Sequence, residues 1–173
     1  DAVDGIAASI SADGKLTLWS STQTPHYVHR LLGKILDVPQ AHIRVIAAPV
    51  GGGFGGKLDP FAHEIAACKL SQLTGRPVKF ALTREEVFYV HRGRHPVLMK
   101  FRTGVTKDGR LTAMHLQTLL DGGAYGSHGP ASTFYTGVLT PVTYELPRFK
   151  FEACRVFTNK PACGPKRGHG PPQ

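Results

Sequence analysis

The stretch Gly51–Leu58 reads GGGFGGKL, and the interpretation of the rest of the chain depends on it. It contains the G-x-G-x-x-G spacing of dinucleotide-binding loops and the G-x-x-x-x-G-K spacing of phosphate-binding loops. The phosphate-binding motif requires Ser or Thr after the lysine to hold magnesium, but Leu58 stands there. The dinucleotide motif requires an acidic residue about twenty positions later, and Arg76 stands there. Neither nucleotide motif is therefore complete.

The glycines keep one property that both motifs share. All the residues from Gly51 to Gly56 except Phe54 are glycine, so this backbone can adopt positive φ and expose consecutive N–H groups. Such a nest of N–H groups binds an anion or an oxo group. Phe54 has two interpretations. Its ring fills the core, which composition alone favours, or it forms a wall of a cofactor pocket.

The residues before the loop predict a hairpin, a helix and a strand. Asp13 and Gly14 stand between two apolar runs, which is typical of a hairpin. Thr24 and Pro25 have the residue types of an N-cap and a first helical position, and apolar residues at helical spacing follow them. The expected strands are residues 5–11, 15–20 and 42–48, and the expected helix runs from 25 to before Pro39.

The residues after the loop predict a longer helix and several strands. Apolar residues nearly encircle the helix expected at Pro60–Thr74, so we expect it to be mostly buried, and Gly75 ends it. Thr83 and Glu86 form a capping box that opens a short helix. Strands are expected at 78–82, 96–106, 110–120 and 149–157, with possible helix within 122–140. Without a regular βαβ rhythm, the fold class is α+β, with mixed sheets and packed helices.

The 173 residues suffice for one domain, and we expect residues 1–173 to be a single partial domain of a larger subunit. The first residues, DAVDGIAASIS, have no signal-peptide pattern and are interpreted as a strand already under way. The last, GPKRGHGPPQ, are interpreted as a loop cut open. No apolar run is long enough to span a membrane.

Charge and cysteine content favour a cytoplasmic protein without nucleic acid. Lys plus Arg exceed Asp plus Glu by nine, but the basic residues are spread along the chain, which favours a solvated basic surface. Cys68, Cys154 and Cys163 are odd in number and lack C-x-x-C spacing. This argues against a disulfide framework or a zinc site, and it fits a reducing compartment.

A longer series of motifs resembles the molybdenum hydroxylase family. In order, these are STQTPH, HIRV, GGGFGGK, TGRPVK, GRHP and a TNKP loop with an Arg-Gly turn. The family includes xanthine dehydrogenases, aldehyde oxidoreductases, molybdenum–copper carbon monoxide dehydrogenases and 4-hydroxybenzoyl-CoA reductases. Its large subunits are several times longer than this chain. The resemblance therefore implies a fragment of a molybdopterin-binding subunit.

The resemblance also implies cofactor-binding roles at matching positions. Gln23 corresponds to the glutamine whose amide reaches a ligand of the molybdenum, and an amide can donate there without adding charge. Arg167 corresponds to an arginine near the metal, and Gly168 permits its close turn. The pterin dithiolene, rather than protein side chains, holds the metal. The residues of the glycine loop beside the cofactor are Gly52, Gly53, Phe54 and Gly55.

Three departures bear on the substrate. Leu58 stands where many purine hydroxylases have a glutamate, which argues against purine chemistry. Gly168 stands where carbon monoxide dehydrogenases have a copper-binding cysteine. The stretch CGPKRGHGPPQ is most similar to the 4-hydroxybenzoyl-CoA reductase branch, and His169 stands where hydroxylases often have aromatic residues. Leu58, Tyr135 and His169 are therefore the candidate substrate residues.

The implied activity is that of a molybdenum-dependent oxidoreductase. It would hydroxylate an aldehyde, N-heterocycle or aromatic substrate, or reductively remove the hydroxyl of an aromatic acyl-CoA. The cofactor would be molybdenum–molybdopterin, with the cytosine dinucleotide as one form. Iron–sulfur clusters and FAD would lie on partner subunits or domains. The family's catalytic glutamate has no match here. The alternative is a non-catalytic basic module that binds an anionic partner.

Overall fold

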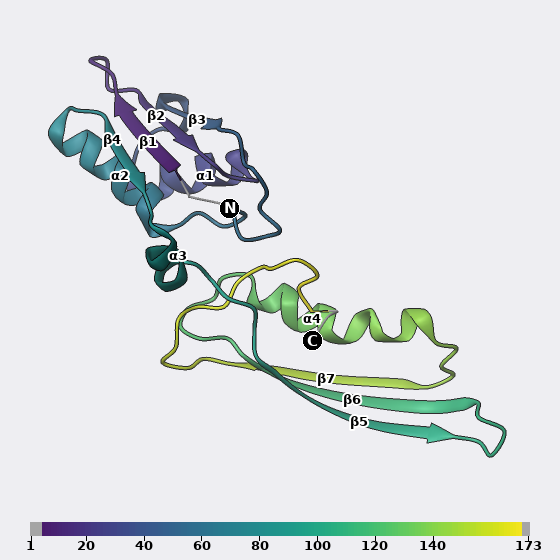
Figure 1. Cartoon of the computed structure of the whole chain (residues 1–173). Helices are drawn as coiled ribbons and strands as arrows, with labels where there is room; N and C mark the ends of the chain where they lie inside the picture. The colour runs from purple at the N-terminus through teal and green to yellow at the C-terminus, as the bar shows by residue number, and fades with distance from the viewer. Residues whose placement is uncertain (1–4, 171–173) are drawn as a thin grey trace. The chain divides into compact units, whose positions relative to one another are not determined.

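The computed structural model describes residues 5–170, and contacts within the chain divide it into two compact units, Asp1–His91 and Arg92–Gln173. Figure 1 shows the course of the chain through both. The strand expected at the first residues and the loop expected at the last fall partly on residues 1–4 and 171–173, which lie outside the described residues.

A four-stranded sheet forms the centre of the first unit. Its order is β3-β2-β1-β4, with β1 antiparallel to both β2 and β4 and β2 parallel to β3. The hairpin predicted around Asp13 and Gly14 is confirmed, because β1 and β2 pair from Ile6 with Ser20 to Ile10 with Leu16. The strands are β1 (Gly5–Ile10), β2 (Leu16–Ser20), β3 (Ile43–Ala47) and β4 (Val78–Ala81).

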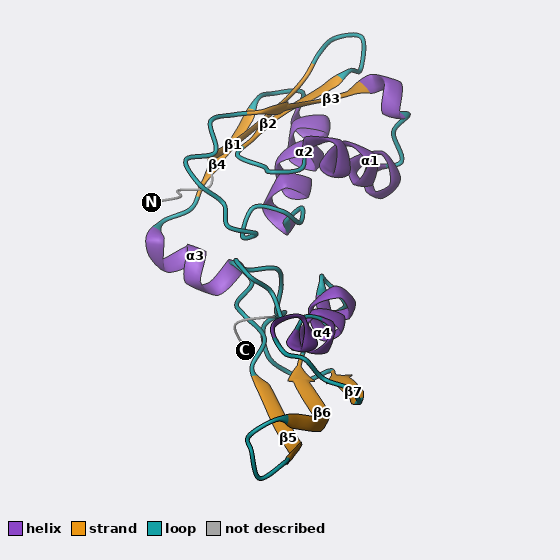
Figure 2. Cartoon of the chain, turned by 90° about the vertical axis from the view of Figure 1, so that its right-hand side faces the viewer, coloured by secondary structure: helices purple, strands orange, loops and turns teal. Residues whose placement is uncertain are grey.

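Two helices, α1 (Pro25–Leu36) and α2 (Ala62–Thr74), cover the same face of this sheet, as Figure 2 shows. The apolar side of α1 and the small residues of α2 close a core over the strands. A 3-10 turn (Gln40–His42) precedes β3, and α3 (Arg84–Val90) begins at the predicted capping box of Thr83 and Glu86. The buried core residues are Ile6, Ala8, Leu16, Leu18, Val28, Leu32, Ile43, Ala67 and Cys68.

The expectation that α2 is buried on nearly all sides is wrong. The side chain of Leu73 is 71% exposed and Leu70 is also exposed, whereas the polar residues His63, Glu64 and Ser71 are buried. The helix packs only one face on the sheet, and that face includes polar positions at its N-terminal end. The apolar residues around the helix did not predict this polar buried face, because polar side chains such as Glu64 are buried when they have hydrogen-bond partners in the interior.

The second unit is a three-stranded sheet covered on one face by α4 (Gly129–Val138). β5 (Val97–Val105) is antiparallel to β6 (Leu111–Asp121), and β6 is parallel to β7 (Phe149–Val156). Gly137 lets α4 approach β7 closely, because a Cβ there would lie 2.2 Å from the ring of Phe151. These elements confirm the α+β class; the helix in 122–140 is α4, followed by a 3-10 turn (Thr140–Thr143).

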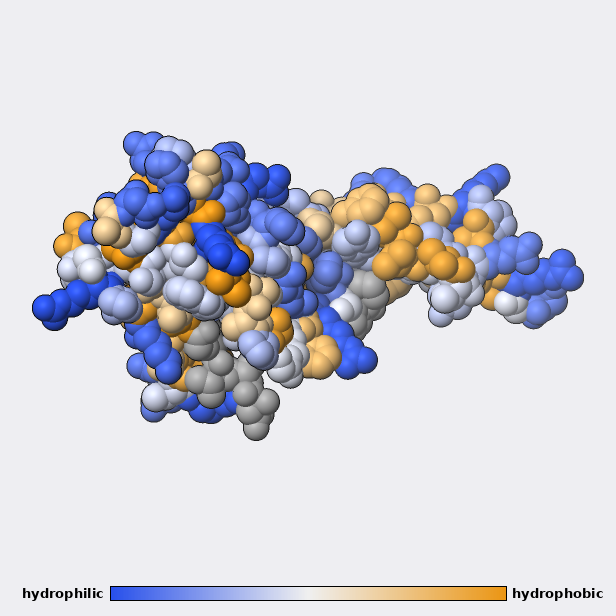
Figure 3. Space-filling model, turned by 90° about the horizontal axis from the view of Figure 1, so that it is seen from above, coloured by the Kyte–Doolittle hydropathy of each residue, from blue (hydrophilic) through white to orange (hydrophobic). Residues whose placement is uncertain are grey.

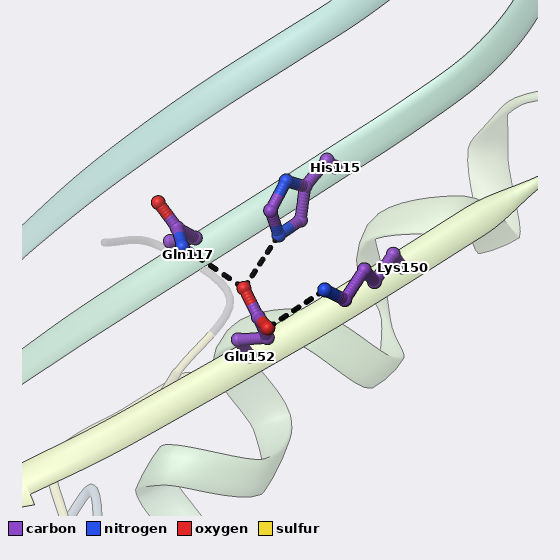
Figure 4. A network of polar contacts seen from close by, with 4 residues as sticks. All are labelled: His115, Gln117, Lys150 and Glu152. Atoms are coloured by element: carbon purple, nitrogen blue, oxygen red, sulfur yellow. Dashed lines mark hydrogen bonds and ion pairs between the residues drawn. The ribbon is translucent and has the colours of Figure 1, made fainter.

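The face of the second sheet turned away from α4 carries a polar network (Figure 4). The Glu152 carboxylate accepts hydrogen bonds from His115 Nε2 at 2.6 Å and Gln117 Nε2 at 2.9 Å, and it pairs with Lys150 Nζ at 2.8 Å. The Lys150 ammonium is the largest influence that lowers the pKa of Glu152 to about 2. On β6, His115 and Gln117 alternate with the buried residues Leu116 and Thr118. The strand therefore has one covered face and one solvated face.

Apolar surface remains exposed in both units, and Figure 3 shows such surface beside hydrophilic surface. The large exposed apolar side chains include Leu73, Phe88, Leu98, Phe101, Val142 and Phe157. No helix within residues 5–170 is long and apolar enough to cross a membrane.

Replacing Leu18, which is fully buried under the two helices, should destabilise the first unit strongly. The Leu18→Ala variant should lose about 2–5 kcal/mol of unfolding free energy, because it loses apolar burial and leaves a cavity. Leu73→Ala removes the same atoms from an exposed position and should change the unfolding free energy by less than about 0.5 kcal/mol. Chemical denaturation of both variants tests this difference, and equal losses would contradict the assigned core.

Candidate functional site

The glycine loop connects β3 to α2 and has the backbone that its sequence predicts. Gly51, Gly52 and Gly55 have φ values of +67°, +123° and +85°. The N–H of Gly56 donates to the carbonyl of Gly53 at 2.7 Å. The helix begins only at Ala62, so its N-terminus does not lie in the glycines as both nucleotide motifs would require.

The side chain of Gln23 fastens this loop. Its Oε1 accepts hydrogen bonds from the backbone N–H groups of Gly55 at 3.1 Å and Lys57 at 3.3 Å, and the backbone N–H of Gln23 donates to the Lys57 carbonyl at 2.8 Å. Backbone N–H groups can only donate, so these bonds determine which end of the carboxamide is the oxygen. The NH₂ group of Gln23 is therefore directed away from these two amides, as a donor.

The loop amides are only partly available to a ligand. The N–H groups of Gly55 and Lys57 are bonded to Gln23, and that of Gly56 is bonded to Gly53. Within residues 5–170, the N–H groups of Gly51, Gly52 and Gly53 have no acceptor. The predicted nest thus reduces to these three consecutive glycine amides near the Gln23 carboxamide.

Gly53 is the position at which glycine is required for space. A Cβ there would lie 2.4 Å from Gln23 Oε1 and 2.6 Å from its Cδ, so any side chain would displace Gln23. Phe54 is 65% exposed and has a φ of +51°, which is uncommon for an aromatic residue. The interpretation that Phe54 fills the core is therefore wrong, and the ring stands at the surface of the loop.

The buried side chain of Lys57 links the two ends of the glycine loop, a role that sequence reasoning missed. Its side chain is only 5% exposed, and Nζ donates to the Val50 carbonyl at 2.6 Å, which joins the end of the loop to its beginning. The prediction that Thr24 caps α1 implied a hydrogen bond from the helix to its side chain, and no such bond is present within the described residues. The Thr24 hydroxyl instead donates to the carbonyl of half-buried Leu58. Both contacts are long-range, so local patterns could not predict them.

A buried carboxylate lies beside the anchored end of the loop. Glu64 accepts hydrogen bonds from the Phe61 N–H at 2.8 Å and from the Ser20 hydroxyl, so it joins the start of α2 to the end of β2. Ser20, Thr22, Lys57, Asp59 and Glu64 line one small pocket together with apolar residues such as Ile6 and Phe61. A Glu at the third helical position is a typical capping residue, which is the signal that could have identified Glu64.

The second unit brings the other predicted site residues together. Gly168 has a φ of +63°, and the turn there places the side chain of Arg167 at the surface. The ring of His169 lies 5.6 Å from that of Tyr135 on α4 and 4.9 Å from that of His128. Burial, followed by the charges of His128 and Arg94, lowers the pKa of His169, which favours the neutral imidazole. Arg167, Gly168, His169 and Tyr135 thus form one surface group.

His95 of the GRHP segment is a buried titratable residue that sequence reasoning missed. Its side chain is 3% exposed, and within the described chain its Nε2 has no hydrogen-bond partner. Burial, and then the charge of Arg155, lowers its pKa. His95 is therefore a neutral interior residue.

Asp121 anchors the start of the loop that leads to Arg167. Its carboxylate accepts hydrogen bonds from the Gly123 N–H at 3.1 Å, the Thr158 hydroxyl at 2.6 Å and the Lys160 ammonium. The Lys160 bond, followed by the Thr158 bond, lowers the pKa of Asp121 to about 2. The end of β6 is thereby tied to the segment after β7.

The cysteines are free thiols, and Cys68 is buried as expected of a small hydrophobic residue. Burial raises the pKa of Cys68 to about 12. Within residues 5–170, no group of three or more His, Cys, Asp or Glu side chains could hold a metal ion.

Comparison with known proteins identifies the family. The sequence model described as "Molybdopterin cofactor-binding domain" matches residues 3–173. The chain belongs to this molybdopterin cofactor-binding family. The resemblance based on the motifs is confirmed at the level of the family, and the assignment to the 4-hydroxybenzoyl-CoA reductase branch stays a prediction.

Two relatives show how much of a longer protein the molybdopterin cofactor-binding region represents. A xanthine dehydrogenase molybdenum-binding subunit of Escherichia coli is 42% identical over 163 residues, covering 93% of this chain and 21% of that protein. A nicotinate dehydrogenase large molybdopterin subunit of Eubacterium barkeri is 42% identical over 161 residues, covering 93% of this chain and 38% of that protein. The chain thus spans well under half the length of either relative.

Solved structures have the same fold. The aldehyde oxidoreductase from Desulfovibrio gigas matches with a TM-score of 0.89 at 26% identity, covering 99% of this chain and 19% of that one. The quinoline 2-oxidoreductase from Pseudomonas putida matches with a TM-score of 0.81 at 31% identity, covering 97% and 22%.

The Gly53→Ala variant should release Gln23 from the glycine loop, because a methyl group cannot fit beside Gln23 Oε1. Hydrogen exchange of the Gly55 and Lys57 amides should become faster. Gly126→Ala is the control. Its backbone lies outside the left-handed region and a Cβ there meets no atom within 4 Å, so it should leave these amides protected. Unchanged exchange in Gly53→Ala would contradict the assigned contact.

The Asp121 network should make the second unit sensitive to acid. The folded pKa of about 2 lies below the ordinary value of 3.8. The carboxylate therefore stabilises the fold above about pH 4, and this contribution disappears as the pH falls toward 2. Unfolding midpoints measured between pH 5 and 2 should fall more steeply for the parent protein than for Asp121→Asn. The exposed Asp108→Asn control should keep the parent slope, and identical slopes for all three would refute this role.

Proposed function

We propose that this chain is the cofactor-binding portion of the large subunit of a molybdenum-dependent oxidoreductase. The observation that carries the proposal is the carboxamide of Gln23, which is fixed on the glycine loop with its NH₂ group turned away as a donor. The family membership indicates a molybdopterin cofactor, and the loop residues fit one. When bound, this cofactor supplies two-electron redox chemistry at the substrate.

The first unit would bind the cofactor through neutral donors. The NH₂ of Gln23 and the N–H groups of Gly52 and Gly53 can donate to oxo or other anionic groups, and none of them brings a charge. Gly53 and Gly55 keep the backbone free of side chains on this stretch. Phe54, exposed on the loop, would shield the group from water. These residues bind and orient; none of them is a general base.

The second unit would supply a fixed cation and an aromatic wall. Arg167 stands at the surface of its turn, and a guanidinium there would stabilise anionic pterin groups or a developing negative charge. Gly168 gives the turn its left-handed backbone. Tyr135 and His169 are the candidate substrate residues of this unit, and Leu58 is the candidate substrate residue of the first unit. A neutral His169 would offer one donor and one acceptor to the substrate.

The substrate class we infer is a small aldehyde or aromatic ring, including N-heterocycles. Relatives whose names specify xanthine, nicotinate, aldehydes and quinoline support this range. Leu58 lacks the carboxylate expected for a purine, and Gly168 lacks the thiolate expected for a copper site. Reductive dehydroxylation of an aromatic acyl-CoA is the other direction compatible with the KRGHG segment.

The working enzyme would contain more than this chain. The names of relatives, "molybdenum-binding subunit" and "large molybdopterin subunit", support an assembly in which other parts carry the remaining redox centres. We propose that those parts hold iron–sulfur clusters and FAD, and that the assembly is cytoplasmic. The exposed apolar side chains of both units are consistent with cover by the remainder of the subunit.

The Gln23→Glu variant of the intact protein tests the proposal. Glu retains an oxygen for the Gly55 and Lys57 amides, but it loses the NH₂ donor and adds a negative charge. The molybdenum content per chain should therefore stay near the parent value while turnover falls roughly 100-fold, the scale for one lost preorganised donor. Gln40→Glu makes the same chemical change at an exposed position and should leave turnover unchanged.

The parent protein provides the second measurement. Purified intact protein should contain molybdenum and release a fluorescent pterin on oxidation. A fully assembled protein without either would contradict the proposal and favour a non-catalytic basic module. Unchanged turnover in Gln23→Glu would contradict the role assigned to Gln23.

A further inference from the structure

We propose that Arg94 is a positioning residue that fixes the turn from which Arg167 acts. This inference rests on the proposed function, because it assigns Arg94 a role in presenting Arg167 to the cofactor or substrate. Arg94 belongs to the GRHP segment, which no local pattern connects with the end of the chain.

The guanidinium of Arg94 spans two consecutive carbonyl groups. Nη1 donates to the Gly168 carbonyl at 3.2 Å, and Nη2 donates to the Arg167 carbonyl at 2.5 Å. Gly168 has a φ of +63°, and in this left-handed turn both carbonyls face Arg94. A planar fork of N–H groups fits such a pair of acceptors, whereas an ammonium group is a single point charge. The contact therefore specifies the backbone on both sides of the peptide bond that follows Arg167.

Arg92 and Gly93, which precede Arg94, contact the segment that leads to Arg167. Gly93 pairs with Cys163 in a parallel bridge, and its carbonyl accepts from the Gly164 N–H at 3.0 Å. A Cβ on Gly164 would lie 2.8 Å from the side chain of Arg92, so the two backbones are in close approach. Residues 92–94 thus contact the segment 163–168 at successive points, and the fork of Arg94 makes the last of these contacts, at Arg167 and Gly168.

The far side of the turn is held independently. A Cβ on Gly170 would lie 2.5 Å from Cβ of Tyr135, so the backbone there rests directly on α4. The turn is therefore held at Arg167 and Gly168 by the Arg94 fork and at Gly170 by this packing contact. Arg94 is itself exposed, so its removal leaves no cavity or buried charge. We therefore expect a local effect on the turn, with little change in the global stability of the protein.

A double-mutant cycle in the intact, cofactor-loaded protein separates positioning from a general structural role. The variants are Arg94→Lys, Arg167→Lys and the double variant, with Arg110→Lys as the control because its side chain is 85% exposed on a distant β-turn. If Arg94 acts through Arg167, Arg94→Lys should lower kcat/KM roughly 10-fold in the parent. In the Arg167→Lys background, Arg94→Lys should change kcat/KM by less than about 2-fold.

Hydrogen exchange provides a readout independent of activity. Arg94→Lys should speed exchange of the amides of residues 166–170 while the melting temperature and molybdenum content stay at parent values. Arg94→Gln, which is shorter and lacks the planar fork of the guanidinium, should do the same. Arg110→Lys should change none of these quantities.

Two results would overturn the assignment. One is an equal loss of kcat/KM from Arg94→Lys in both backgrounds, which would mean that Arg94 acts independently of Arg167. The other is unchanged exchange at 166–170 in both Arg94 variants. Failure of the proposed function would look different, since the parent protein would then lack molybdenum and pterin altogether, whatever the exchange rates of this turn.

Discussion

The hydrogen bonds from the Gly55 and Lys57 amides to the carboxamide of Gln23 are the constraint on which the first unit's site depends. They place a side chain from the segment before α1 against a loop more than thirty residues later. They also explain why position 53 lacks a side chain, since Gln23 occupies that space. Lys57 closes the same loop through the Val50 carbonyl. A flexible run of glycines thereby becomes a defined surface with a few directed, uncharged donors.

The second unit also contains a glycine-dependent turn with a defined conformation, but other contacts hold it. Its Arg-Gly turn is shaped by a left-handed glycine, by the fork of Arg94 and by packing of Gly170 on α4. The functional groups here are a cation and aromatic rings rather than amides. The first unit thus offers neutral donors, and the second offers a positive charge and aromatic rings. Both belong to a family defined by molybdopterin binding.

Local chemistry made most of the fold predictable. Asp13-Gly14 specifies the first hairpin, Gly75 ends α2 in a left-handed conformation, and Thr83 with Glu86 caps α3, all within a few residues. The polar face of α2 was not predictable, because the partner of Glu64 is Ser20, which lies 44 positions earlier. The Thr24 hydroxyl bonds to Leu58 rather than to its own helix for the same reason. Gln23, the glycine loop and Arg167 were identified by resemblance; Lys57, His95 and Arg94 required the structure.

A crystal structure of the intact protein with its cofactor would test the central claim most directly. The account predicts that Gln23 Oε1 still accepts from the Gly55 and Lys57 amides, while Gln23 Nε2 lies within hydrogen-bond distance, about 2.7–3.2 Å, of a ligand atom on the molybdenum. A structure in which Gln23 points away from the glycine loop, or in which the cofactor lies beyond the reach of its amide, would contradict it.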